Sequence, residues 1–280
     1  MNLNNPLSQY FRQPAIYIKL PSKGNYYPSG TLDMPENSEL PVLPMTAIDE
    51  ITYRTPDALF SGQAVVNVIQ SCIPNIKDAW AIPAIDVDTI LVAIRIASYG
   101  HEMKFNTQCP ACNNEDEYGV DLRTVVDGMT TPDYSAPIKQ GDIEIYFKPM
   151  TYKNLSDNNR IQYDEQRLFQ NLNINDGEAD ITKMAAMSEA LKKMTEITVA
   201  ALSQSILTIK TPQAMVSEPE FIAEFMKNCD RNLFNRIQNY VIEHKTQAEM
   251  QPVGIKCVSC QNEYKQTITL DMTSFFVPAS

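Results

Sequence analysis

Two Cys-x-x-Cys pairs constrain this chain more than any other feature of its sequence. Cys109 and Cys112 form the first pair, Cys257 and Cys260 form the second, and about 144 residues lie between the pairs. Two intervening residues let one tight turn present both sulfurs to a single ion, and zinc prefers four soft donors in a tetrahedron. The pairs therefore predict a shared zinc site. The segment between them must then leave and return at one point, with the zinc fixing how the two parts of the chain are joined.

The surroundings of the two pairs match. Each pair follows an apolar approach, precedes a polar Asn-Glu tip and continues into an alternating segment typical of a β-strand. Each half predicts a zinc-knuckle hairpin, and together they predict a zinc ribbon. The alternative is two separate redox or free thiol pairs, but a redox motif lies at a strand-to-helix junction and neither pair does. Because four thiolates leave no open coordination position, we expect a structural zinc.

The charge balance limits the partners of this chain. It has 23 Lys and Arg against 34 Asp and Glu, a net charge of −11, so phosphate is repelled and nucleic-acid binding is not expected. The knuckle tips carry acidic and amide side chains where a phosphate-facing ribbon would carry Lys or Arg. No apolar run approaches the roughly 20 residues that span a bilayer, and no secretory pattern is visible. We expect a cytoplasmic folding compartment, in which thiols stay reduced.

The expected fold class is α+β, arranged in four segments. It combines a small N-terminal β layer with helices, a four-cysteine zinc ribbon built from two distant knuckles, and a helical-bundle insertion. Prolines keep the first strands short, so the N-terminal arm is expected either to dock on a partner or to cover the helical core. The segments are an extended arm (1–45), an α+β part with the first knuckle (46–150), the helical insertion (151–250) and the second knuckle (251–280).

Cap and breaker residues predict three helices in the first half of the chain. Arg95 lies on the third of them and is expected either to bind a buried carboxylate, such as Asp86 or Asp88, or to lie at the helix edge with its guanidinium in water. The helices are expected from Thr46, from Pro56 to Cys72, and from the cap Asp86 to Tyr99, where Gly100 ends the helix.

The insertion follows a predicted strand at Ile143–Phe147 and shows apolar residues at helical spacing. These stripes indicate an intramolecular bundle, or a groove that a partner helix or another copy of the chain fills. Cys72 and Cys229 lie among apolar neighbours and are expected to be plain core residues. The three helices are predicted at 151–172, 181–208 and 219–244.

The motifs of common enzymes are missing. The chain has nine glycines, no Gly-rich phosphate loop, two histidines and no nucleophile elbow. Acidic pairs such as Asp86 with Asp88 are typical of a helix N-terminus or a solvated face. We therefore expect no enzyme and no catalytic residue, but a zinc-stapled interaction protein.

Four motifs in the first half of the chain carry a resemblance to a known family. They are Leu20–Gly24 followed by Tyr27-Pro28, Pro44–Glu50, Asp86–Gly100 and Cys109–Cys112. Through them the chain resembles, over roughly residues 15–125, the baseplate hub assembly proteins of T4-like contractile-tailed bacteriophages. The resemblance implies a non-enzymatic role in building the central hub with other hub proteins in the infected bacterial cytoplasm, as an assembly factor or as part of the virion tail. A cytosolic zinc-ribbon adaptor or regulator unrelated to phage tails is the alternative.

Overall fold

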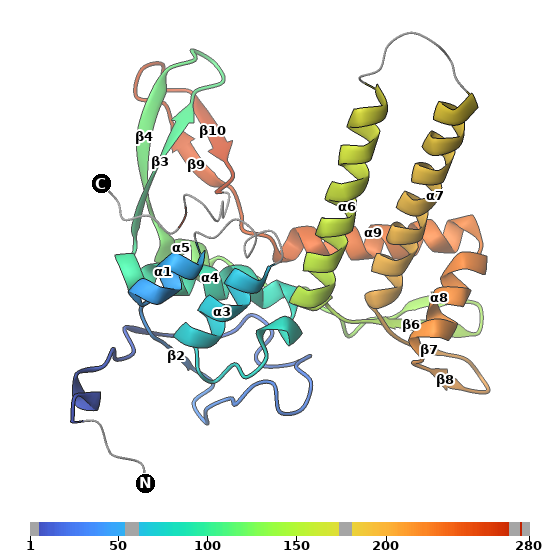
Figure 1. The fold of residues 1–280 in the computed structure, drawn as a ribbon, viewed down its shortest axis with the longest axis horizontal. Coiled ribbons are helices and arrows are strands. Elements are labelled where there is room, and N and C mark those ends of the chain that lie inside the picture. Colours follow the sequence, from blue (N-terminus) through green and yellow to red (C-terminus); the bar gives the residue numbers. More distant parts are fainter. Residues whose placement is uncertain (1–5, 54–61, 174–180, 269–274, 276–280) are drawn as a thin grey trace. The chain divides into compact units, whose positions relative to one another are not determined.

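The structure, a computed structural model, describes residues 6–53, 62–173, 181–268 and Phe275 (Figure 1). The chain divides into two compact units. Unit 1 comprises residues 1–81, 85–131 and 248–280, and unit 2 comprises residues 82–84 and 132–247. Residues 132–150, which we expected to belong with the first knuckle, therefore lie in unit 2.

The N-terminal segment of unit 1 carries the predicted pair of short strands. Strands β1 (Ile16–Ile18) and β2 (Leu40–Val42) are antiparallel, with Ile16 opposite Val42. A 3-10 turn, η1 (Ser8–Tyr10), precedes them. The Arg12 guanidinium holds this segment in place, since it donates to the carbonyl oxygen of Pro44 (2.5 Å) and to the carbonyl and hydroxyl oxygens of Ser71 (both 2.7 Å).

Helices α1 (Ala47–Tyr53), α3 (Gln63–Cys72) and α4 (Ala84–Tyr99) follow in the predicted order. The start of α1 is a reciprocal cap, because the Thr46 hydroxyl accepts from the amide of Asp49 and the Asp49 carboxylate accepts from the amide of Thr46. The start predicted at Pro56 lies outside the described residues. Two short helices, η2 (Ala79–Ala81) and α5 (Leu122–Asp127), complete unit 1.

Asp86 does not act as the predicted cap, because α4 begins two residues earlier. Its side chain is fully buried and accepts three hydrogen bonds, from the amide of Ser22 (2.8 Å), the hydroxyl of Ser22 (2.5 Å) and the hydroxyl of Tyr27 (3.1 Å). Burial raises the pKa of Asp86 to about 6, against the opposing effect of the bonds from Ser22 and Tyr27. Asp86 therefore anchors the loop that carries Ser22 and Tyr27 to α4.

Arg95 also differs from both of its predicted roles. It is 1% exposed, so it does not extend into water. Its guanidinium donates to the carbonyl oxygens of Phe275 (3.0 Å) and Gly100 (3.2 Å) and lies 4.9 Å from the ring centre of Tyr99. Burial lowers the pKa of Arg95. The predicted carboxylate is replaced by carbonyl partners that the helix end and the C-terminal segment provide.

Unit 2 contains an antiparallel sheet in the order β5-β6-β7-β8. Here the predicted helix to Thr208 is wrong beyond Gln204, because β7 forms at Ile206–Lys210 and pairs with β6, placing Thr208 opposite Tyr146. In β7 the exposed Leu207 lies between the buried Ile206 and Thr208, as in a strand, and pairing with β6 outweighs the helical spacing that precedes it. The other strands are β5 (Ile138–Gln140), β6 (Ile143–Phe147) and β8 (Met215–Val216).

The helices of unit 2 are α6 (Tyr152–Asn173), α7 (Ile181–Gln204), α8 (Pro219–Asn228) and α9 (Arg231–Ala248). The single helix predicted over 219–244 is thus two helices. Cys229 is extended at the break and half-buried, and the Asp230 carboxylate accepts from the amides of Asn232 (2.9 Å) and Leu233 (3.0 Å) to cap α9. Sheet and helices share one core, so the insertion is not purely helical. Its buried residues include Ile145, Phe147, Leu202, Ile209, Met226 and Ile237.

Candidate metal centre

Two β-hairpins of unit 1 carry the cysteine pairs, and they lie beside one another in Figure 1. In the first hairpin, β3 (Glu102–Gln108) pairs with β4 (Glu115–Asp121). In the second, β9 (Val253–Lys256) pairs with β10 (Glu263–Gln266). Both predicted knuckle hairpins therefore form, although the second ends its pairing at Gln266 and the predicted strand end at Leu270 lies outside the described residues.

The two knuckles share one backbone geometry. In each, the amide of the first cysteine donates to the carbonyl five positions later, and the residue after the second cysteine donates back to the carbonyl of the first. These distances are 2.9 and 2.9 Å in the first knuckle and 2.9 and 3.0 Å in the second. The residue after the second cysteine is left-handed in both, Asn113 with φ 56° and Gln261 with φ 61°. This turn is what points two sulfurs from one strand end toward one place.

The four sulfurs meet. Cys109 Sγ lies 3.7 Å from Cys260 Sγ, Cys112 Sγ lies 3.7 Å from Cys257 Sγ, and all four sulfurs lie within 4.8 Å of one another. A tetrahedron with metal–sulfur bonds of about 2.3 Å has edges of about 3.8 Å, so the spacing fits one tetrahedral ion. Each hairpin contributes one buried and one exposed cysteine, since Cys109 and Cys257 are buried and Cys112 and Cys260 are exposed. The cluster is able to bind a metal.

The pKa values of the cysteine thiols also favour metal binding. Desolvation disfavours the Cys109 thiolate, but hydrogen bonds from the backbone of Cys112 and Ala111 and from neighbouring thiols lower its pKa to about 6. The backbone of Asn114 favours the Cys112 thiolate, yet the surrounding sulfurs raise its pKa to about 12. Four thiolates this close would repel one another, so the four sulfurs do not all lose their protons when no cation is bound. A divalent cation held by Cys109, Cys112, Cys257 and Cys260 would supply the charge that lets the remaining protons leave.

Both cysteine pairs belong to unit 1. Residues 132–247 of unit 2 separate the two pairs in sequence. A shared metal would therefore join two segments of unit 1 that lie before and after this part of unit 2 in the chain. This replaces our expectation that the metal fixes how two parts of the chain are joined.

Two hydrogen bonds between the hairpins were not predicted from the sequence. The Thr107 hydroxyl donates to the side-chain oxygen of Gln266 (2.9 Å), and the Tyr118 hydroxyl donates to the carbonyl oxygen of Lys256 (3.2 Å). A signal for them exists in the sequence, because Tyr118 and Gln266 each lie six positions after the second cysteine of their pair.

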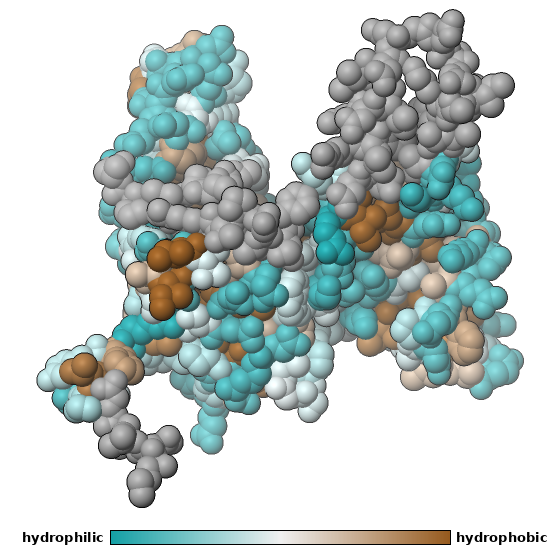
Figure 2. Space-filling view, viewed as in Figure 1, coloured by the Kyte–Doolittle hydropathy of each residue, from teal (hydrophilic) through white to brown (hydrophobic). Residues whose placement is uncertain are grey.

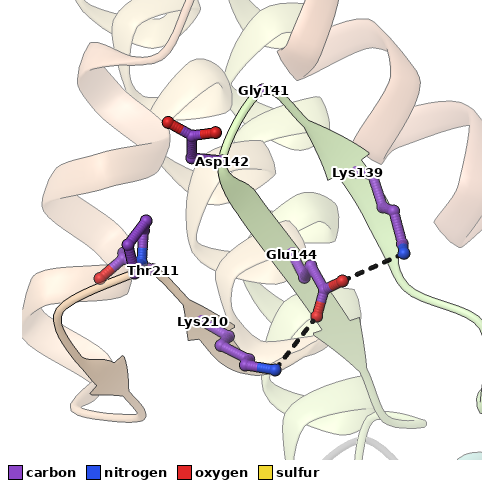
Figure 3. Close-up of a pocket in the computed structure, with 7 residues that line it drawn as sticks. Lys139, Gly141, Asp142, Glu144, Lys210 and Thr211 are labelled. Atoms are coloured by element: carbon purple, nitrogen blue, oxygen red, sulfur yellow. Dashed lines mark ion pairs between the residues drawn. The ribbon is translucent and has the colours of Figure 1, made fainter.

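Unit 2 has a hollow of about 370 Å³ that charged side chains line (Figure 3). Lys139 and Lys210 point at Glu144 from either side, with nitrogen–oxygen distances of 3.1 and 3.6 Å. The register places all three on neighbouring strands, β5, β6 and β7. These charges bind one another, which supports the strand register rather than a converging catalytic set.

Comparison with known protein families matches residues 45–277 to the family described as T4 bacteriophage base plate protein. The chain belongs to this family. Comparisons with curated proteins and with solved structures found no match. The family confirms that this is a phage baseplate protein, and the alternative of an adaptor unrelated to phage tails is wrong. None of the helices among the described residues is long and apolar enough to cross a membrane.

Proposed function

We propose that this baseplate protein is a non-enzymatic structural or assembly component of the tail hub, built around a structural zinc held by Cys109, Cys112, Cys257 and Cys260. The observation that carries the proposal is the convergence of four sulfurs from segments 145 positions apart, in a chain of a baseplate family. A closed set of four thiolates binds the ion without leaving a position for a substrate. The role of the metal is therefore to stabilise the fold.

The donor set favours zinc. Tetrahedral sites of four sulfurs select zinc or iron among the common metals. Two of the four cysteines, Cys112 and Cys260, are exposed residues, and zinc, which has no redox chemistry, would close such a site without electron transfer. The metal content of the purified full chain tests this assignment. We expect one zinc per chain by elemental analysis, loss of that zinc in Cys112→Ser, and retention in the control Cys229→Ser, whose thiol belongs to unit 2 and is not one of the four clustered sulfurs.

Exposed apolar side chains support contacts with other proteins. Leu7, Tyr10 and Phe11 on the N-terminal segment are 61%, 77% and 57% exposed, and Ile48 and Ile51 on α1 are 74% and 71% exposed. Figure 2 shows apolar surface over α1 and at the N-terminal turn. Exposed apolar groups of this kind commonly mark protein-binding surfaces. The partners are other baseplate hub proteins, with a second copy of the chain as a further candidate.

Assembly takes place in the cytoplasm of the infected bacterium. The experiment asks whether the chain also remains in the finished tail. An affinity-tagged full chain is expressed during infection, and baseplate intermediates and finished particles are purified and cross-linked. We expect cross-links to proteins at the centre of the baseplate. Recovery of the chain without any baseplate protein would contradict a role in this assembly, and cross-links confined to peripheral proteins would contradict the hub assignment.

A further inference from the structure

The two hairpins are joined by two hydrogen bonds, and each second strand contributes one of the side chains that make them. Tyr118 follows Cys112 by six positions and reaches the carbonyl of Lys256, the residue directly before Cys257. Gln266 follows Cys260 by six positions and accepts from Thr107, which lies two positions before Cys109. Each hairpin therefore uses the same position of its second strand to hold the strand that leads into the other cysteine pair.

These contacts fix the direction in which the sulfurs approach. Cys109 and Cys257 are the buried sulfurs, each 1% exposed, and each lies one or two residues beyond a residue that the opposite hairpin holds. Thr107 is itself buried, at 7% exposure, so its hydroxyl finds its partner in Gln266 away from most solvent. A shift of either hairpin along the other would separate the sulfur pairs that now lie 3.7 Å apart.

We propose that Tyr118, Thr107 and Gln266 are positioning residues of the metal site, which set its affinity by docking the two hairpins in register. The inference rests on the metal site of the proposed function. Side chains behind the ligands commonly tune metal affinity by fixing ligand orientation. Because these side chains are not metal ligands and bond to the opposite hairpin, their effect passes through the placement of the cysteines.

The chain offers a matched control. Tyr264 lies on β10, and its hydroxyl is buried without a hydrogen-bond partner among the described residues. Tyr118→Phe and Tyr264→Phe therefore make the same chemical change, one in the second strand of each hairpin. Only the first removes a hydrogen bond between the hairpins.

The experiment titrates the metal-depleted full chain with Zn²⁺ against a chromophoric chelator of known affinity, and with Co²⁺ to follow its thiolate absorption. One hydrogen bond corresponds to about a two- to tenfold change in an equilibrium constant. We expect Tyr118→Phe and Thr107→Val each to weaken Zn²⁺ binding by about that factor, and Thr107→Ser and Tyr264→Phe to leave it unchanged. The Co²⁺ spectrum of the weakened variants should keep the shape of a four-thiolate site.

A purely structural role predicts a different pattern. If the bonds only support the fold, Tyr118→Phe lowers the unfolding midpoint equally with and without Zn²⁺, and the affinity for Zn²⁺ stays at the wild-type value. That result overturns the inference while leaving the metal site intact. If Tyr118→Phe does not fold, the pair Thr107→Val and Thr107→Ser decides the question in the same way. A wild-type chain that binds no Zn²⁺ would overturn the metal site itself, and the inference with it.

Discussion

The buried Asp86 carboxylate makes a testable prediction about how stability depends on pH. Burial raises the pKa of Asp86 from 3.8 to about 6. The folded state therefore binds a proton more tightly than the unfolded state, so Asp86 adds stability as pH falls from about 7 toward 4. A change of about two pKa units corresponds to about 3 kcal/mol in the free energy of unfolding.

Asp86→Asn isolates this contribution. The amide oxygen can still accept from the amide of Ser22, and the NH₂ group then takes the place of the oxygen that faces the hydroxyls of Ser22 and Tyr27, which can accept from it, while the side chain no longer titrates. The difference in unfolding free energy between the wild-type chain and this variant should change by about 2.4 kcal/mol between pH 7 and pH 4, in favour of the wild type at low pH. Subtracting the two curves removes the contributions of other titrating groups, including Asp88, whose pKa burial also raises to about 6.

The assay is urea unfolding at several pH values, followed by tryptophan fluorescence. The chain has one tryptophan, Trp80, and it lies in unit 1 with Asp86. The signal therefore reports the unit in which the carboxylate is buried. Parallel pH dependences for the wild type and Asp86→Asn would refute the reasoning, because they would mean that Asp86 titrates alike in the folded and unfolded states.

Three further predictions concern both units. Strong chelation should lower the unfolding free energy of unit 1, reported by Trp80, by about 3 to 4 kcal/mol relative to free Zn²⁺ at 100 to 1,000 times its dissociation constant, and Cys112→Ser should show no such response. Arg95→Met removes the guanidinium that donates to the buried carbonyl group of Phe275, so urea unfolding of unit 1 should show a loss of about 1 to 3 kcal/mol. In unit 2, Asp230→Ala removes a helix cap and should cost about 1 kcal/mol, whereas Ile237→Ala opens a core cavity and should cost about 2 to 5 kcal/mol. Circular dichroism measures both, and an Ile237→Ala variant as stable as the wild type would contradict the assigned core.

Features that depend on neighbouring residues were predictable from the sequence. The knuckles are one example, because the turn that presents two sulfurs is complete within six residues, Cys109–Asn114 in the first hairpin. The strand at Ile143–Phe147 and the end of α4 before Gly100 are others. In each case the signal and the structure it produces lie within a few positions of one another.

Features decided by distant residues were missed. Asp86 has the sequence context of a cap, but Ser22, 64 positions away, determines its place. Ile206–Lys210 continues a helical spacing until β6 supplies a strand to pair with. The break at Asp230 is a different case, since a cap signal was present there and the continuous apolar stripe concealed it.

The order of the cysteines along the chain also sets a sequence of events during synthesis. The first pair leaves the ribosome 145 positions ahead of its partners, a delay of about 7 to 30 seconds at ordinary rates of translation. During that interval only two of the four donors exist, and all of unit 2 is made before the others arrive. Coordination can thus be completed only by a polypeptide translated past Cys260, and a product truncated within unit 2 would lack half of the ligands.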